Sequence, residues 1–106
     1  MPIPQLSAPE LKTLIDGGQP LELVDVRTAE ECAIARIGGA RLLDQQYHEE
    51  LLARDRDTLM VFQCHHGMRS QAAAEYFRAA GFRNVQNLEG GIDAWSLLVD
   101  PSVPRY

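Results

Sequence analysis

The sequence predicts an α/β fold in which a mainly parallel central sheet carries helices on both faces, giving three layers. One observation is an alternation along the chain between segments with helix-capping signals and short segments rich in apolar and β-branched residues. A second is that residues 58–63 (TLMVFQ) are nearly all apolar, which is typical of a parallel strand buried on both faces. In such a fold, ligands bind at the carboxyl ends of the strands.

The first elements follow from capping and periodicity. Ser7 and Glu10 have the spacing of a capping box, which predicts a helix from about Ala8 to Ile15 that stops at Gly17-Gly18. Residues 21–26 (LELVDV) then predict a strand.

The middle of the chain repeats this order. Thr28 and Glu31 again have capping-box spacing and predict a short helix. A turn is expected at Gly38-Gly39 and a short strand over residues 40–43. Asp44 is expected to cap a helix that continues to about Arg54.

The last part of the chain is expected to hold two helices and a strand after the strand at 58–63. A helix is predicted from Arg69 to Ala80, with Gly81 as its left-handed stop, followed by a strand at 85–88 and a helix after Gly90-Gly91. The expected core positions of the two helices are Ala72, Ala73, Tyr76, Phe77 and Ala80 in the first and Trp95, Leu97 and Leu98 in the second.

Length and charge set the class of protein. The 106 residues fit one domain, with a core over about 6–98 and a short tail over 99–106 that contains two prolines. The net charge of -5 argues against nucleic acid as a partner and favours small molecules or proteins. No long apolar segment or leader pattern is present and only two cysteines occur, so we expect a cytoplasmic, reducing location away from the membrane.

A loop after the strand at 58–63 carries the candidate chemistry. It joins a buried strand to a helix N-terminus, where backbone N–H groups lack helical partners and the helix dipole favours an anion. A cysteine thiolate at such a place has a lowered pKa and is nucleophilic. The candidate site residues are Cys64 as the nucleophile and His65, His66, Gly67, Met68, Arg69 and Ser70 as its anion-binding loop.

This loop resembles the active-site loop of the rhodanese family, which reads Cys, two variable residues, Gly, one variable residue, Arg and Ser. Other landmarks occur in the family's order over about residues 6–98: Asp25-Val26-Arg27 with Glu31, the segment 81–85 (GFRNV), Leu88-Glu89-Gly90-Gly91, and Trp95. The resemblance implies a rhodanese-like fold and a sulfurtransferase. In it, Cys64 would take a sulfane sulfur from a donor such as thiosulfate, carry it as a persulfide, and pass it to cyanide, a thiol or a sulfur-accepting protein. No metal or organic cofactor is implied.

The resemblance has departures. Where the family usually reads Gly-His-Ile-Pro-Gly-Ala, residues 35–40 read ARIGGA, so Arg36 and Gly38 replace a customary His and Pro. We expect Cys32 to be a small core residue and not a second redox centre. Asp25, Arg27 and Glu31 are expected to form a buried network that supports the loop.

Several alternatives stay open on sequence alone. A non-catalytic binding module with this fold is the first. A phosphatase or arsenate reductase is the second, although four residues separate Cys64 from Arg69 where the related phosphatases place five. We hypothesise that His65 or His66 contacts the donor or acceptor, the alternative being solvent-exposed loop histidines. A metal site in Cys64-His65-His66 is not expected, because adjacent residues rarely converge on one ion and no further ligand cluster is evident in the sequence.

Overall fold

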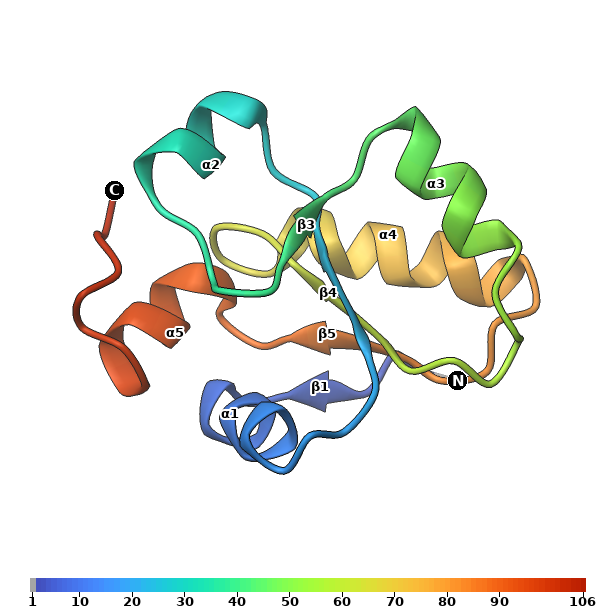
Figure 1. Ribbon diagram of the computed structural model, residues 1–106, viewed down its shortest axis with the longest axis horizontal. Coiled ribbons are helices and arrows are strands. Elements are labelled where there is room, and N and C mark those ends of the chain that lie inside the picture. The colour runs from blue at the N-terminus through green and yellow to red at the C-terminus, as the bar shows by residue number, and fades with distance from the viewer. Residues whose placement is uncertain (1) are drawn as a thin grey trace.

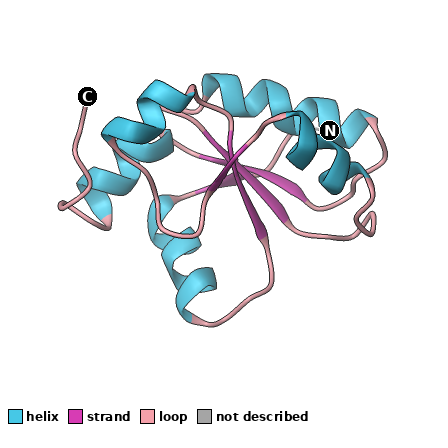
Figure 2. Cartoon of the chain, turned by 45° about the horizontal axis from the view of Figure 1, so that its top comes forward, coloured by secondary structure: helices cyan, strands magenta, loops and turns pink. Residues whose placement is uncertain are grey.

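The computed structural model describes residues 2–106, and its centre is a five-stranded sheet. The strands are β1 (Gln5–Leu6), β2 (Glu22–Asp25), β3 (Arg41–Leu42), β4 (Met60–Gln63) and β5 (Val85–Leu88), in the spatial order β1-β5-β4-β2-β3. Every neighbouring pair is parallel, so the predicted parallel sheet is confirmed. Figure 2 shows the strands at the centre of the molecule with the helices outside them.

Helices cover both faces of this sheet and complete the predicted three layers. They are α1 (Ala8–Asp16), α2 (Ala29–Ile34), α3 (Gln45–Leu52), α4 (Met68–Ala79) and α5 (Gly91–Leu98). Residues of α1 and α5 share one core cluster, and residues of α3 and α4 share the other, on the opposite face of the sheet (Figure 1). Among the described residues, no helix has both the length and the apolar character needed to cross a membrane.

Local signals account for most helix ends. Both predicted capping boxes form, with Ser7 and Glu10 at the start of α1 and Thr28 and Glu31 at the start of α2. Asp44 caps α3 by accepting a hydrogen bond from the Tyr47 N–H, as expected. β5 has the predicted bounds, β2 and β3 are each one residue shorter at both ends, and β4 begins two residues later than predicted and ends where predicted.

The predicted core positions of α4 and α5 are partly wrong. In α4, Phe77 is buried as expected, but Ala72, Tyr76 and Ala80 are exposed. The buried face of α4 is formed by Phe77 together with Ser70 and Ala74. In α5, Trp95 is buried as expected. Leu97 and Leu98 instead point to solvent, with exposed fractions of 58% and 65%. The prediction assumed that the buried face of each helix consists of hydrophobic residues. Each buried face instead includes a serine, Ser70 in α4 and Ser96 in α5.

The parallel arrangement places the carboxyl ends of all strands at one edge of the sheet. The loops that follow β2, β4 and β5 therefore meet there, and the loop after β4 is the yellow loop at the left of Figure 1. The described tail after α5 returns to this same edge, where Val103 is buried and its carbonyl accepts a hydrogen bond from Ser96. The short strand β1 was not predicted from the sequence.

Candidate active site

Cys64 directly follows β4 and is almost completely buried, with 1% of its surface exposed. The strand backbone is held at this point by the first turn of α5. The Ile92 N–H donates to the Cys64 carbonyl at 2.8 Å, and the Asp93 N–H donates to the His65 carbonyl at 3.1 Å. Gly91 makes this approach possible, because a Cβ at this position would lie 2.3 Å from the Cys64 oxygen. The strand end and the start of α5 are thus locked together.

The loop then turns back over the sulfur. Gly67 has a φ of +105°, which glycine adopts without strain, and its N–H donates to the Cys64 Sγ at 3.1 Å. The helix α4 begins at the next residue, and the Ser70 hydroxyl in its first turn lies 3.4 Å from Sγ. The sulfur therefore sits at the N-terminus of a twelve-residue helix, where the helix dipole favours a negative charge.

These contacts set the ionisation of the thiol. Burial acts to raise the pKa of Cys64, but the hydrogen bond from the Ser70 hydroxyl and those from the backbone N–H groups of Ser70, Gly67 and Arg69 outweigh it. The pKa of Cys64 is lowered from its ordinary value as a result. The backbone groups that act on Sγ come from three loop residues, a smaller set than the run of N–H groups expected from the sequence. The hydrogen bonds to Sγ therefore favour the thiolate over the thiol, and the thiolate is the nucleophilic form of cysteine.

A buried asparagine braces the loop from the neighbouring strand. Asn87 in β5 accepts a hydrogen bond from the Ser70 hydroxyl at 2.5 Å, and its amide donates to the Gly67 carbonyl at 3.0 Å. The same amide donates to the side chain of Gln5 in β1 at 3.0 Å. Sequence reasoning missed Asn87, although a polar residue within a predicted buried strand was the available signal.

The predicted network of Asp25, Arg27 and Glu31 forms, and its centre is a buried ion pair. Asp25 and Arg27 lie 2.6 Å apart with side chains 2% and 0% exposed. Burial acts to raise the pKa of Asp25, but hydrogen bonds from Arg27 and Cys32 lower it below its ordinary value. The prediction that Cys32 is a core residue is wrong. Its side chain is half-buried outside both core clusters, and its thiol donates to the Asp25 carboxylate at 3.2 Å.

Glu31 connects this pair to the loop after β4. The Arg69 guanidinium donates two hydrogen bonds to the Glu31 carboxylate, at 2.7 and 3.0 Å, and these hold the pKa of Glu31 well below its usual range. The side chain of Arg69 therefore contacts a carboxylate, while its backbone N–H is the part that acts on the sulfur. Tyr106 completes the link, because its hydroxyl accepts from Arg27 at 2.9 Å and donates to Glu31 at 2.7 Å.

The two histidines of the loop form a stack with the tail. The ring of His65 lies between those of His66 and Tyr106, with centroid distances of 3.9 and 4.0 Å. His65 is half-buried and His66 is exposed, so the expectation of solvent-exposed loop histidines holds for His66 alone. Met68 is 83% exposed and turns away from the sulfur side of the loop into solvent.

The turn in which two family residues are replaced is formed nonetheless. The Ala40 N–H donates to the Ile37 carbonyl at 3.1 Å, with Gly39 in the left-handed region. Ile37 is buried and Arg36 is exposed, so the replacement of His by Arg adds no buried charge.

An open pocket of about 360 Å³ adjoins the loop on the side of β1 and β5. Its walls include Gly67 and Met68 from the loop, Asn87 from β5 and Gln5 from β1. Cys64 is not among its lining residues, so this pocket lies beside the sulfur and does not contain it.

Comparison with known proteins agrees with this geometry. The family model of the rhodanese-like domain matches residues 7–98. Thiosulfate sulfurtransferase GlpE of Pseudomonas aeruginosa is 37% identical over 93 residues, which make up 86% of this chain and 83% of that protein. The probable adenylyltransferase/sulfurtransferase MoeZ of Mycobacterium tuberculosis is 35% identical over 100 residues, which cover 92% of this chain but only 26% of MoeZ.

Solved structures give the same result. The crystal structure of a rhodanese-like domain protein from Staphylococcus aureus aligns with a TM-score of 0.78 at 30% identity, covering 98% of this chain and 99% of the other. The motif resemblance, the sheet order and these matches agree, and the chain belongs to the rhodanese-like family.

Proposed function

We propose that this protein is a sulfurtransferase in which Cys64 carries a sulfane sulfur from a donor such as thiosulfate to a thiophilic acceptor. The observation that carries the proposal is the state of the Cys64 sulfur. It is buried, held by the Gly67 N–H and near the Ser70 hydroxyl at the start of α4, and its pKa is lowered. The relation to GlpE, whose name specifies thiosulfate, supports the choice of donor.

The reaction consists of two displacements at sulfur. The Cys64 thiolate attacks the sulfane sulfur of thiosulfate, a new S–S bond forms, and the S–S bond of thiosulfate breaks with release of sulfite. Cys64 is then a persulfide whose negative charge lies on the outer sulfur. Cyanide or a thiolate attacks that outer sulfur, leaves with it, and returns Cys64 as a thiolate. In each step the nucleophile supplies the electron pair of the new bond and the leaving group takes the pair of the broken S–S bond, so the cycle needs no external oxidant or reductant and the scheme assigns no role to a cofactor or metal.

The loop residues have separate roles in this scheme. The N–H groups of Gly67, Arg69 and Ser70 hold the charge on Cys64. His65 and His66 directly follow Cys64 and are the loop side chains that we expect to meet the donor or acceptor, whereas Met68 serves only as the first residue of α4. Fixed donors of this kind stabilise a negative sulfur as an oxyanion hole stabilises oxygen. Asp25, Arg27 and Glu31 are supporting residues, because they act on the loop through Arg69 and not on the sulfur.

The burial of Cys64 bears on which partners can react with it. Because only 1% of Cys64 is exposed, we expect a small donor, or one that presents a terminal persulfide sulfur. The acceptor must be able to reach the outer sulfur of the Cys64 persulfide. A sulfur-accepting protein would have to present an extended thiol. Both cysteines stand as free thiols, which fits a reducing compartment such as the cytoplasm.

The test is the intact mass of the protein after incubation with thiosulfate. We expect a gain of one sulfur on Cys64, discharged by cyanide with release of thiocyanate. The Cys64→Ser variant should gain nothing, and the matched Cys32→Ser variant should gain one sulfur as the native protein does. Folded protein with reduced Cys64 that gains no sulfur from thiosulfate or from other persulfide donors would refute the proposal and favour a non-catalytic binding module. Hydrolysis of an aryl phosphate would instead point to a phosphatase.

A further inference from the structure

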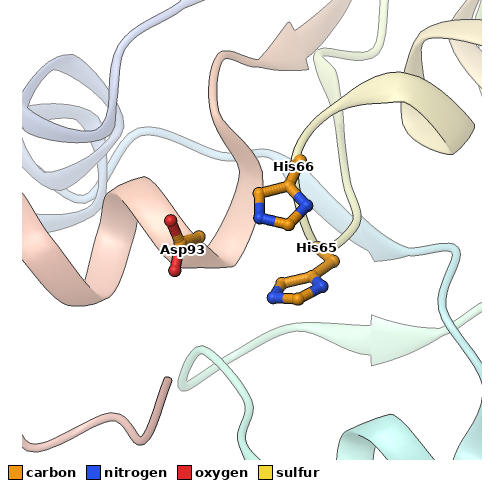
Figure 3. A group of neighbouring side chains, drawn as sticks. All are labelled: His65, His66 and Asp93. Carbon is orange, nitrogen blue, oxygen red and sulfur yellow. The ribbon is translucent and has the colours of Figure 1, made fainter. Parts of the chain in front are cut away.

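A group of three metal-ligating side chains lies beside the catalytic loop. His65 and His66 belong to the loop after β4, and Asp93 belongs to the first turn of α5. One ligand atom from each residue can be chosen so that all three lie within 4.8 Å of one another. Figure 3 shows a ring nitrogen of each imidazole on the side that faces the Asp93 carboxylate. Within residues 2–106 no other group of three His, Cys, Asp or Glu side chains meets this criterion.

The backbone fixes these residues relative to one another. The Asp93 N–H donates to the His65 carbonyl at 3.1 Å, so the third ligand is held against the loop by a main-chain hydrogen bond. The sequence could not show this convergence, since 27 positions separate Asp93 from His66 in the chain. The expectation of no further ligand near the two histidines is therefore corrected.

A second observation points to a ligand at this place. The Nε2 atom of His65 is buried and has no hydrogen-bond partner. Because more than nine in ten buried polar groups have a hydrogen-bond partner, an imidazole nitrogen without a protein partner is a position where a further ligand atom is favourable. The rings of His66 and Tyr106 cover the two faces of the His65 ring, so a partner meets the nitrogen at the ring edge.

We propose that His65, His66 and Asp93 form a binding site for a divalent transition metal ion of the Zn²⁺ class. Two imidazole nitrogens and one carboxylate oxygen suit zinc, nickel or copper, and not the oxygen-seeking calcium or magnesium ions. Zinc binds such atoms at about 2.0–2.2 Å, so tetrahedral ligands stand about 3.4 Å apart. The three ligand atoms lie within 4.8 Å of one another, and rotation of the exposed His66 ring and of the Asp93 side chain brings them to the tetrahedral spacing.

Arg105 competes with the metal for the same carboxylate. Its guanidinium donates to the two oxygens of Asp93 at 2.8 and 3.3 Å, and its side chain is 57% exposed. A metal ion must displace this arginine, which links metal binding to release of the tail. Replacing Arg105 should therefore strengthen metal binding, whereas replacing a ligand should weaken it.

The experiment is a titration of the reduced protein with Zn²⁺ against a chromophoric chelator. His66→Gln and Asp93→Asn should each weaken binding by about 10- to 100-fold or more, as the removal of groups around a metal does. Arg105→Gln should strengthen binding by up to about fivefold, because an exposed ion pair no longer competes. The matched controls are His48→Gln, a half-buried histidine on α3, and Asp57→Asn, whose carboxylate also pairs with an arginine. Both should bind as the native protein does.

Cys64 needs its own control, because a thiolate next to a histidine also binds zinc. The Cys64→Ser variant should keep the affinity of the native protein, and Co²⁺ in the native protein should show no sulfur-to-metal charge-transfer band. Loss of binding in Cys64→Ser, or unchanged binding in both His66→Gln and Asp93→Asn, would overturn the proposal. Circular dichroism confirms that each variant is folded. Since binding is the readout, the outcome does not depend on whether the protein transfers sulfur.

Discussion

The substitution Gly91→Ala tests the contact that fixes the catalytic loop to α5. A Cβ at this position would lie 2.3 Å from the Cys64 carbonyl oxygen and 2.5 Å from that of His65, distances that real Cβ atoms do not show. Both obstacles are backbone atoms at the end of a central strand, so neither can move aside easily. Gly91 also has a φ of +60°, which side chains other than that of glycine disfavour.

The magnitude follows from two contributions. A residue with a Cβ in the left-handed region costs about 1–2 kcal/mol. Moving the start of α5 away from β4 weakens the hydrogen bonds from Ile92 and Asp93 to the two carbonyls, each worth about 0.5–1.5 kcal/mol. We therefore expect Gly91→Ala to lower the free energy of unfolding by about 2–5 kcal/mol, and to raise the pKa of Cys64 because the cradle around its sulfur shifts.

Urea denaturation measures the first effect, and the ultraviolet absorbance of the thiolate against pH measures the second. Substitutions at two other glycines separate the cost of the left-handed backbone from the cost of the steric clash. Gly39 has a φ of +86° but open space around it, so Gly39→Ala should lose only about 1–2 kcal/mol. Gly38 has neither feature, and Gly38→Ala should be neutral or stabilising by about 0.4–1 kcal/mol. If Gly91→Ala loses no more stability than Gly39→Ala, the steric reasoning is refuted.

Three further variants test separate parts of the structure. The Gln63 amide is fully buried without a hydrogen-bond partner, so Gln63→Met should raise the free energy of unfolding in urea denaturation by up to about 1–3 kcal/mol; a loss of stability would show that the amide has an unseen partner. Arg27→Met leaves the buried Asp25 carboxylate without its charged partner and should cost about 3–5 kcal/mol at neutral pH. Because folding lowers the pKa of Asp25, the ion pair contributes its full stability above pH 3.8, the ordinary pKa, and loses it as the pH falls through the folded-state pKa. The difference in unfolding free energy between Arg27→Met and the native protein should therefore shrink below pH 3.8 in acid denaturation. A difference that stays constant with pH would contradict this. Ser70→Ala should raise the pKa of Cys64 in the same absorbance titration, and an unchanged pKa would remove Ser70 from the cradle.

Features that depend on neighbours in the sequence were predictable. The capping box of Thr28 and Glu31 is a local exchange of hydrogen bonds, so its spacing was enough to start α2 at the right residue. The run at residues 58–63 gave the central strand, because only a strand covered on both faces needs so many apolar residues in succession. The loop from Cys64 to Ser70 was found for the same reason, since a strand, a glycine and a helix start follow one another directly.

Features that join distant segments were not predictable. Asn87 reaches the loop only because β5 lies next to β4, and Tyr106 reaches Glu31 only because the tail folds back past α5. Asp93 lies near the histidines through a contact between main chains. Leu97 and Leu98 show the reverse error, because their apolar character suggested burial although the adjacent layer is already filled by Ile92 and Trp95.

The position of β1 bears on how the molecule is made. This strand pairs only with β5, so Gln5 meets Asn87 across a separation of 82 residues. During synthesis β1 emerges early and stays unpaired until almost the whole sheet has left the ribosome, at about 5–20 residues per second. Gln5 and Asn87 also support the Gly67 turn, so the loop around Cys64 has all of its contacts only once β1 and β5 have paired. A nascent or truncated chain that lacks β5 would carry Cys64 and its loop but not the Asn87 side chain that braces them.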